Sequence, residues 1–181
     1  MDSISSFIDY FRQTLDLKNQ GFVNEMNVSK EFFLDFVNYT PPILAELEFY
    51  ISQKHIEKFY ARLNDLKYLC VFNEELNKYW FSMRALSGAL CKLNKKRSLK
   101  SAHKVHEYYI RKYGDRKILS SENWFEIKRW HFLDELGAIS ETGELNDFIE
   151  RNITLLKSYL DHYILNLNRF IGEIRKTLSL K

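Results

Sequence analysis

Two observations on the sequence predict an all-α protein, a bundle of six or seven helices. Apolar residues recur at the spacing of a helix with one buried face along most of the chain. Turn residues are scarce, with 6 Gly and 2 Pro among 181 residues, whereas a protein of many short strands needs frequent turn signals. A hydrophobic share of 45%, with 14 Phe and 11 Tyr, provides the apolar surface for a core and excludes wholesale disorder.

Two short helices are expected first. Residues 4–17 carry one apolar face, and Ser29 is placed to cap a helix over KEFFLDFVN, residues 30–38. That helix should end before Pro41, because a residue that precedes proline avoids the α-helical region.

One long helix is predicted from residue 43 to about residue 69, since no Gly or Pro interrupts this segment. Thr40 is expected to cap it and Pro41 to lie in its first turn, where a missing N–H costs nothing. Its buried stripe is predicted to hold Ile43, Leu47, Ile51, Ile56, Phe59, Leu63 and Leu66.

Two capped helices should follow. Asn73 is predicted to cap a helix over residues 74–93, and Ser98 a helix over residues 99–113 that Gly114 ends in a left-handed conformation. The inward side chains of the first are predicted to be Leu76, Tyr79, Trp80, Met83 and Leu86.

A β-hairpin is the alternative for part of this region. The segments 69–72 and 79–83 flank NEEL and would be its two strands. The charge pattern and the leucine spacing favour helices.

The last two helices are predicted over residues 121–137, bounded by Ser121 and Gly137, and over residues 145–178. The final helix is long for a globular protein, so it either breaks near Asn166 or packs against a partner helix. Its apolar stripe is predicted to hold Ile149, Ile153, Leu156, Leu160, Ile164, Leu167 and Ile171. In the helix over residues 121–137, the side chains expected to be buried against the bundle are Trp124, Ile127, Trp130 and Leu133.

The sequence indicates a cytoplasmic protein. No apolar run reaches the roughly 18 residues that span a bilayer, and the N-terminal segment lacks the basic region of a signal peptide. Cys70 and Cys91 stand alone, without metal-ligand spacing, and are expected to be reduced, mostly buried thiols.

No pattern in the chain predicts catalytic residues, a cofactor or a metal ion. A Ser-His-Asp set and a Gly-rich phosphate loop are both missing, and the carboxylates are scattered. His103 and His106 have the spacing to ligate a metal from one helix face, but no third ligand lies nearby in the sequence. We expect them to be surface histidines.

Positive charge is concentrated in one segment. Residues 92–117 hold ten Lys or Arg against two acidic residues, a balance of +8, so the rest of a chain of net charge +3 sums to −5. This asymmetry indicates a polyanionic partner, although a solvated helix face is the alternative. Tyr108 could bond a phosphate or stack on a base. The candidate contacts here are Lys95, Lys96, Arg97, Lys100, Lys104, Arg111 and Lys112.

Three blocks of the sequence resemble the RteC-type regulators of Bacteroides conjugative transposons. They cover FVNYTPPILAELEFY (36–50), FYARLNDLKYLCVFNEELNKYWFS (59–82) and WFEIKRWHFLDELGAISETGEL (124–145), with FIGEIR (170–175) after them. The residues that correspond are Pro41, Leu47, Phe49, Tyr50, Leu66, Asn73, Tyr79, Trp80, Ser82, Trp124, Lys128, Glu135, Leu136 and Gly143.

The resemblance implies a two-part helical protein that binds DNA and activates the transcription of excision genes. An N-terminal bundle would cover residues 1–93, and residues 94–181 would hold the basic helix and a winged-helix-like C-terminal unit. The second helix of such a unit enters the major groove. The implied contacts are Arg169, Arg175 and Lys176, with Lys128 and Arg129 near the DNA backbone.

Two other functions remain open. Arg97 and His103 resemble the Arg-x(4–6)-His motif of HEPN ribonucleases, which are also small helical bundles. A helical module that binds only protein is the third hypothesis. In that case the long C-terminal helix would be its docking surface, and the same helix is the candidate interface of a homodimer.

Overall fold

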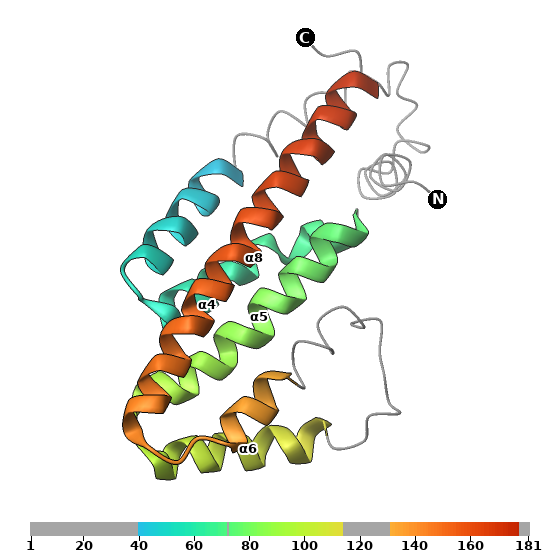
Figure 1. The fold of residues 1–181 in the computed structure, drawn as a ribbon. Helices are drawn as coiled ribbons and strands as arrows, with labels where there is room; N and C mark the ends of the chain where they lie inside the picture. Colours follow the sequence, from blue (N-terminus) through green and yellow to red (C-terminus); the bar gives the residue numbers. More distant parts are fainter. Residues whose placement is uncertain (1–39, 72, 114–130, 178–181) are drawn as a thin grey trace.

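The computed structural model describes residues 40–71, 73–113 and 131–177, and within these ranges its regular structure is entirely helical (Figure 1). This agrees with the all-α prediction, and the alternative hairpin is wrong. The helices, in order, cover residues 40–52, α4 (Ile56–Leu63), the 3₁₀ helix η1 (Asn64–Val71), α5 (Glu74–Lys95), α6 (Leu99–Tyr113), residues 131–137, and α8 (Thr142–Thr177).

Several predicted features lie outside the described residues. They are the helices expected over 4–17 and 30–38, the helix end at Gly114, the helix start at Ser121, and the side chains of Trp124, Ile127, Lys128, Arg129 and Trp130.

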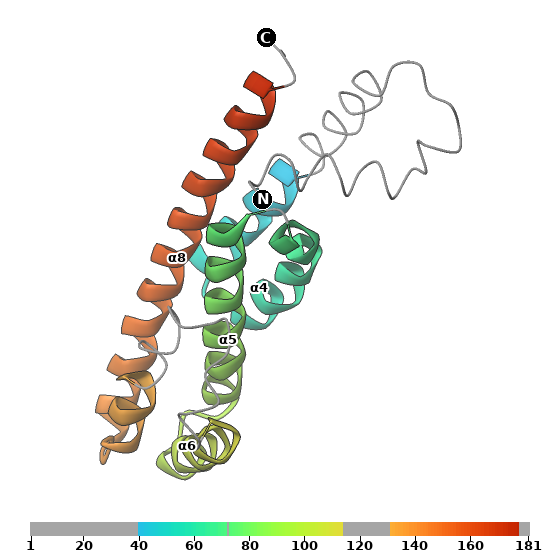
Figure 2. The ribbon, with the colours of Figure 1, turned by 90° about the vertical axis from the view of Figure 1, so that its right-hand side faces the viewer.

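The centre of the bundle is the pair α5 and α8, which run side by side in opposite directions (Figures 1 and 2). Trp80 of α5 and Phe148 and Tyr163 of α8 are among its largest fully buried side chains. The indole Nε1 of Trp80 donates a 2.8 Å hydrogen bond to the carbonyl of Leu63, which fixes α4 against α5. Burying an indole requires such a partner for its N–H.

A single hydrophobic cluster extends through the described helices. It joins residues of the 40–52 segment, such as Ile43, to residues at the end of α8, such as Phe170. The core therefore draws side chains from both sides of the predicted division between residues 93 and 94, and that division stays a prediction.

The predicted long helix over 43–69 is wrong, because the chain turns at residues 53–55. Lys54 has φ 57°, the left-handed conformation. The N–H of His55 donates to the carbonyl of Tyr50 at 2.8 Å, and that of Lys54 to Ile51 at 3.1 Å. This pair of bonds is the Schellman ending of a helix, with lysine where glycine is usual. All seven side chains of the predicted stripe are nevertheless buried.

Both predicted caps of the middle helices are confirmed. The side chain of Asn73 accepts a 3.0 Å hydrogen bond from the N–H of Leu76, and that of Ser98 accepts one of 3.1 Å from Ser101. Tyr79 is only partly buried, whereas the other inward residues predicted for α5 are fully buried.

The last helix does not break at Asn166. α8 continues for 36 residues, and the Asn166 side chain donates to the His162 carbonyl at 2.8 Å without interrupting it. Its apolar stripe packs on α5, which is the partner helix that the pattern required. Four residues, 138–141, connect it to the helix over 131–137, whose Leu133 is buried as predicted.

Gly137 ends that helix where the imidazole of His106 comes close. A Cβ at this position would lie 2.7 Å from His106 Nε2, so the site favours glycine. None of the helices in the described ranges combines the length and the apolar character needed to cross a bilayer.

Candidate nucleic-acid interface

The basic segment forms α6 and the turn that precedes it, and α6 is attached to the bundle by a narrow face. Ala102 and Val105 are its buried residues, and Leu99 and Tyr109 are partly buried against the core. Both views show α6 at one end of α5, beside the first turns of α8 (Figures 1 and 2). Most of its remaining surface is exposed.

Four lysines of this region are exposed and have no acidic partner among the residues that the structure describes. Within the described residues, no carboxylate lies within 4.0 Å of the ammonium groups of Lys95, Lys96, Lys100 or Lys104. We call these four residues the lysine group. Lys100 and Lys104 are four positions apart on α6, so their side chains share one face of the helix. Lys96 ends α5 with an extended backbone.

Arg111 and Lys92, two other cations of the segment, are engaged within the protein. Arg111 pairs with Glu107 at 3.6 Å, one turn away on α6. The ammonium of Lys92 lies 3.4 Å from the centre of the Tyr108 ring, a cation–π contact. Such contacts reduce the charge available to a partner, which separates these residues from the lysine group.

An open hollow on α6 includes Lys104 of the lysine group. It is lined by Lys104, Glu107, Tyr108, Arg111 and Lys112, and the Tyr108 side chain is 47% exposed. Lys104 and the exposed ring of Tyr108 suit a phosphate with an adjacent base or sugar. The single carboxylate of the hollow, on Glu107, is already paired with Arg111.

The C-terminal candidates lie far from α6. Arg169 and Lys176 are exposed in the last turns of α8, and Arg175 also belongs to that helix. At 1.5 Å of rise per residue, Arg169 lies roughly 28 Å along the helix from Glu150, which faces the α5–α6 turn. The structure therefore does not bring the two groups of predicted contacts together.

The start of α8 has the wrong charge for a recognition helix. Exposed Glu141, Glu144 and Asp147 surround its first turns. In a helix-turn-helix protein, this end of the second helix faces the base edges and phosphates. The turn of four residues fits that motif, but the acidic surface does not. A winged-helix unit also needs strands, and the described residues contain none.

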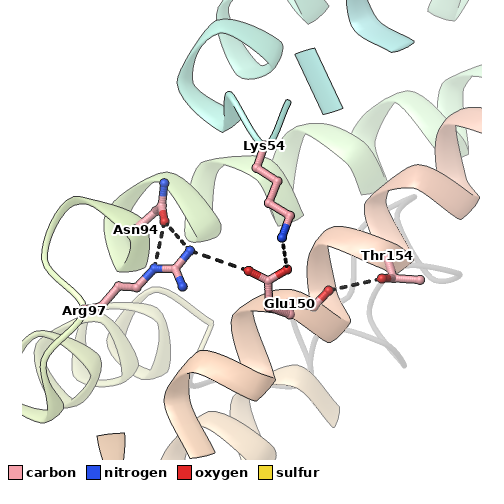
Figure 3. A network of polar contacts seen from close by, with 5 residues as sticks. All are labelled: Lys54, Asn94, Arg97, Glu150 and Thr154. Atoms are coloured by element: carbon pink, nitrogen blue, oxygen red, sulfur yellow. Dashed lines mark hydrogen bonds and ion pairs between the residues drawn. The ribbon is translucent and has the colours of Figure 1, made fainter. Parts of the chain in front are cut away.

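A polar network next to the basic turn joins three parts of the molecule (Figure 3). The carboxylate of Glu150, on α8, lies 2.8 Å from Lys54 Nζ and 3.9 Å from Arg97 Nη2. Arg97 also donates from Nε and Nη2 to the side-chain oxygen of Asn94, at 3.1 and 2.9 Å. Lys54, Asn94 and Glu150 were not predicted from the sequence. Lys54 and Glu150 lie 43 and 53 positions from Arg97, so no local pattern indicates that they meet near it.

The two cysteines have the properties of half-buried structural thiols. Burial raises the pKa of Cys70 and of Cys91 to about 11, so both remain protonated at neutral pH. Within the described residues, no group of three or more His, Cys, Asp or Glu side chains is placed to hold a metal ion. His103 is exposed, as predicted, and His106 is partly buried against Gly137.

No protein-family model matches this chain, and neither a curated protein nor a solved structure matches it significantly. The RteC-type resemblance stays a prediction from the sequence.

Proposed function

We propose that this chain is a non-enzymatic, cytoplasmic DNA-binding protein that regulates transcription from a mobile element. The observation that carries the proposal is the lysine group, four exposed ammonium groups without an acidic partner among the described residues. Lysines that contact phosphates release condensed counterions, and this release is the main source of affinity for duplex DNA. The role in transcription and the mobile element come from the RteC-type resemblance alone.

The proposed DNA-binding surface is α6 with the α5–α6 turn, and not the start of α8. Lys104 belongs to both the lysine group and the hollow around Tyr108, and Lys100 lies one turn before it on α6. The acidic first turns of α8 would repel phosphates. Arg169, Arg175 and Lys176 would reach DNA only as a second, separate contact, and a homodimer through α8 stays a prediction.

A salt titration of binding to a short DNA duplex tests the proposal. Each phosphate contact contributes a slope of about −0.9 to log K against log salt, so the lysine group predicts a slope near −4. A flat titration, or no binding at low salt, would remove the proposal.

The same protein incubated with single-stranded RNA tests the ribonuclease alternative. Cleavage that Arg97→Ala and His103→Ala abolish would replace DNA binding as the leading function. Against that outcome, the Arg97 side chain is engaged by Asn94 and Glu150.

A further inference from the structure

The network around Glu150 suggests how the DNA-binding surface is limited. It contains two cations, Lys54 and Arg97, and one carboxylate that lies within ion-pair distance of both. All three side chains are partly exposed, between 35% and 57%. An incoming phosphate therefore has access to the same donors that Glu150 now occupies.

We propose that Glu150 is an internal competitor for the polyanion: it holds Lys54 and Arg97 until phosphates displace it. When it is displaced, the cationic surface extends from the lysine group across the α5–α6 turn to the turn at residues 53–55. The inference deepens the proposed function and rests on it. It adds Lys54, a residue on a different element, to the DNA-binding surface.

The geometry of Arg97 favours this exchange. Asn94 holds its Nε and Nη2 in place through neutral hydrogen bonds. The Glu150 oxygen is 3.9 Å from Nη2, the outer limit of an ion pair, so little direct bonding is lost when it leaves. No contact within the described residues uses Nη1, and a guanidinium offers a planar fork that fits phosphate oxygens.

The geometry of Lys54 keeps its ammonium near the same carboxylate. Its backbone is fixed in the left-handed conformation by the helix ending at residues 50–55. Glu150 is anchored on the opposite side, one turn before Thr154, whose hydroxyl donates to the Glu150 carbonyl at 3.2 Å. The helix ending at residues 50–55 and α8 therefore place the cation and the carboxylate together.

The test compares Glu150→Gln with the wild-type chain in the salt titration on duplex DNA. Glutamine keeps the size of the side chain and removes its charge. We expect DNA affinity to increase about 3- to 10-fold at 0.1 M salt, and the slope to steepen by up to about 2, one step for each cation released.

Asp161→Asn is the matched control. It removes the same charge from an exposed position of α8, roughly 16 Å further along the helix, beyond the screening length of about 10 Å at 0.1 M salt. A gain in affinity that appears for Glu150→Gln and not for Asp161→Asn supports the competitor. If Glu150→Gln and Asp161→Asn raise the DNA affinity equally, the inference is overturned, because the loss of one negative charge anywhere on α8 then explains the gain.

Removing Lys54 and Arg97 tests whether the gain in DNA affinity comes from these two partners of Glu150. Adding Lys54→Gly and Arg97→Ala to Glu150→Gln should abolish the gain, and glycine also suits the left-handed backbone at residue 54. A gain that survives both changes overturns the inference. If wild type and Glu150→Gln bind DNA equally, the inference fails and the proposed function stands. If neither binds at low salt, both fail.

Discussion

The α5–α8 pair and α6 are both helical, but they are held in the molecule in different ways. α5 buries nine residues, among them Trp80, Met83 and Leu90. α6 buries Ala102 and Val105, and its other described side chains are exposed or partly buried. Large apolar side chains therefore hold α5 in the core, whereas the fully buried side chains of α6 are small.

This difference in burial shows which residues are free to bind another molecule. Burying a large apolar side chain contributes about 1.5–3 kcal/mol, so the identity of the core residues is set by folding. The exposed lysines of α6 contribute little to folding, because exposed charges gain little from their neighbours. Folding therefore does not require their clustering, and the proposed DNA-binding surface is our explanation for it.

Removing one aromatic side chain from each region should give the largest contrast. Trp80→Ala opens a cavity and leaves the Leu63 carbonyl without its donor, so we expect the free energy of unfolding to fall by about 3–5 kcal/mol. Tyr108→Ala loses the contacts of this exposed ring with Lys92 and Tyr109 and should cost only about 1 kcal/mol. Urea unfolding of both variants measures this. Similar losses from the two would mean that α6 is as much part of the core as α5.

Two substitutions at Lys54 test whether the turn at residues 53–55 depends on a left-handed backbone. Lys54→Gly and Lys54→Ala both remove the ion pair with Glu150, but only glycine tolerates φ 57° without strain. The glycine variant should be more stable than the alanine variant by about 1 kcal/mol. Thermal unfolding of the pair checks this, and equal stabilities would contradict a left-handed residue 54.

The pH dependence of stability should report on the half-buried thiols beside the core. Folding raises the pKa of Cys70 and Cys91 from 9.0 to about 11, so the folded state retains protons that the unfolded state loses. This contribution to stability is complete below pH 9 and is lost as the pH rises toward 11. Because both thiols are only partly buried, we expect a fall of at most about 1 kcal/mol. The Cys70→Ala and Cys91→Ala double variant should show a flatter profile, and an unchanged profile would rule out the thiols as its source.

Much of the fold was predictable because helix periodicity and caps are local signals. Asn73 and Ser98 cap the helices that they were predicted to cap, and the stripe from Ile43 to Leu66 is buried throughout. The turn at residues 53–55 was missed because lysine, not glycine, adopts the left-handed conformation there. A signal was nevertheless present, since the stripe advances by five positions between Ile51 and Ile56 instead of three or four.

The candidate site was less predictable. The charge of α6 could be read from the sequence, but which cations are engaged could not. Arg97 and Lys54 are 43 positions apart and meet at Glu150, a further 53 positions along the chain. Such contacts depend on how α8 packs against α5, which no local pattern specifies. The same packing separates Arg169 from α6, although both had been predicted to contact DNA.

The salt dependence of DNA binding by two charge-matched double variants tests the central claim most directly. Lys96→Ala with Lys100→Ala removes half of the lysine group, whereas Lys67→Ala with Lys157→Ala removes two exposed lysines from η1 and α8. The first pair should weaken binding and make the log–log slope shallower by about 2, and the second should leave the slope unchanged. Equal slopes for the two variants would contradict a DNA-binding surface on α6.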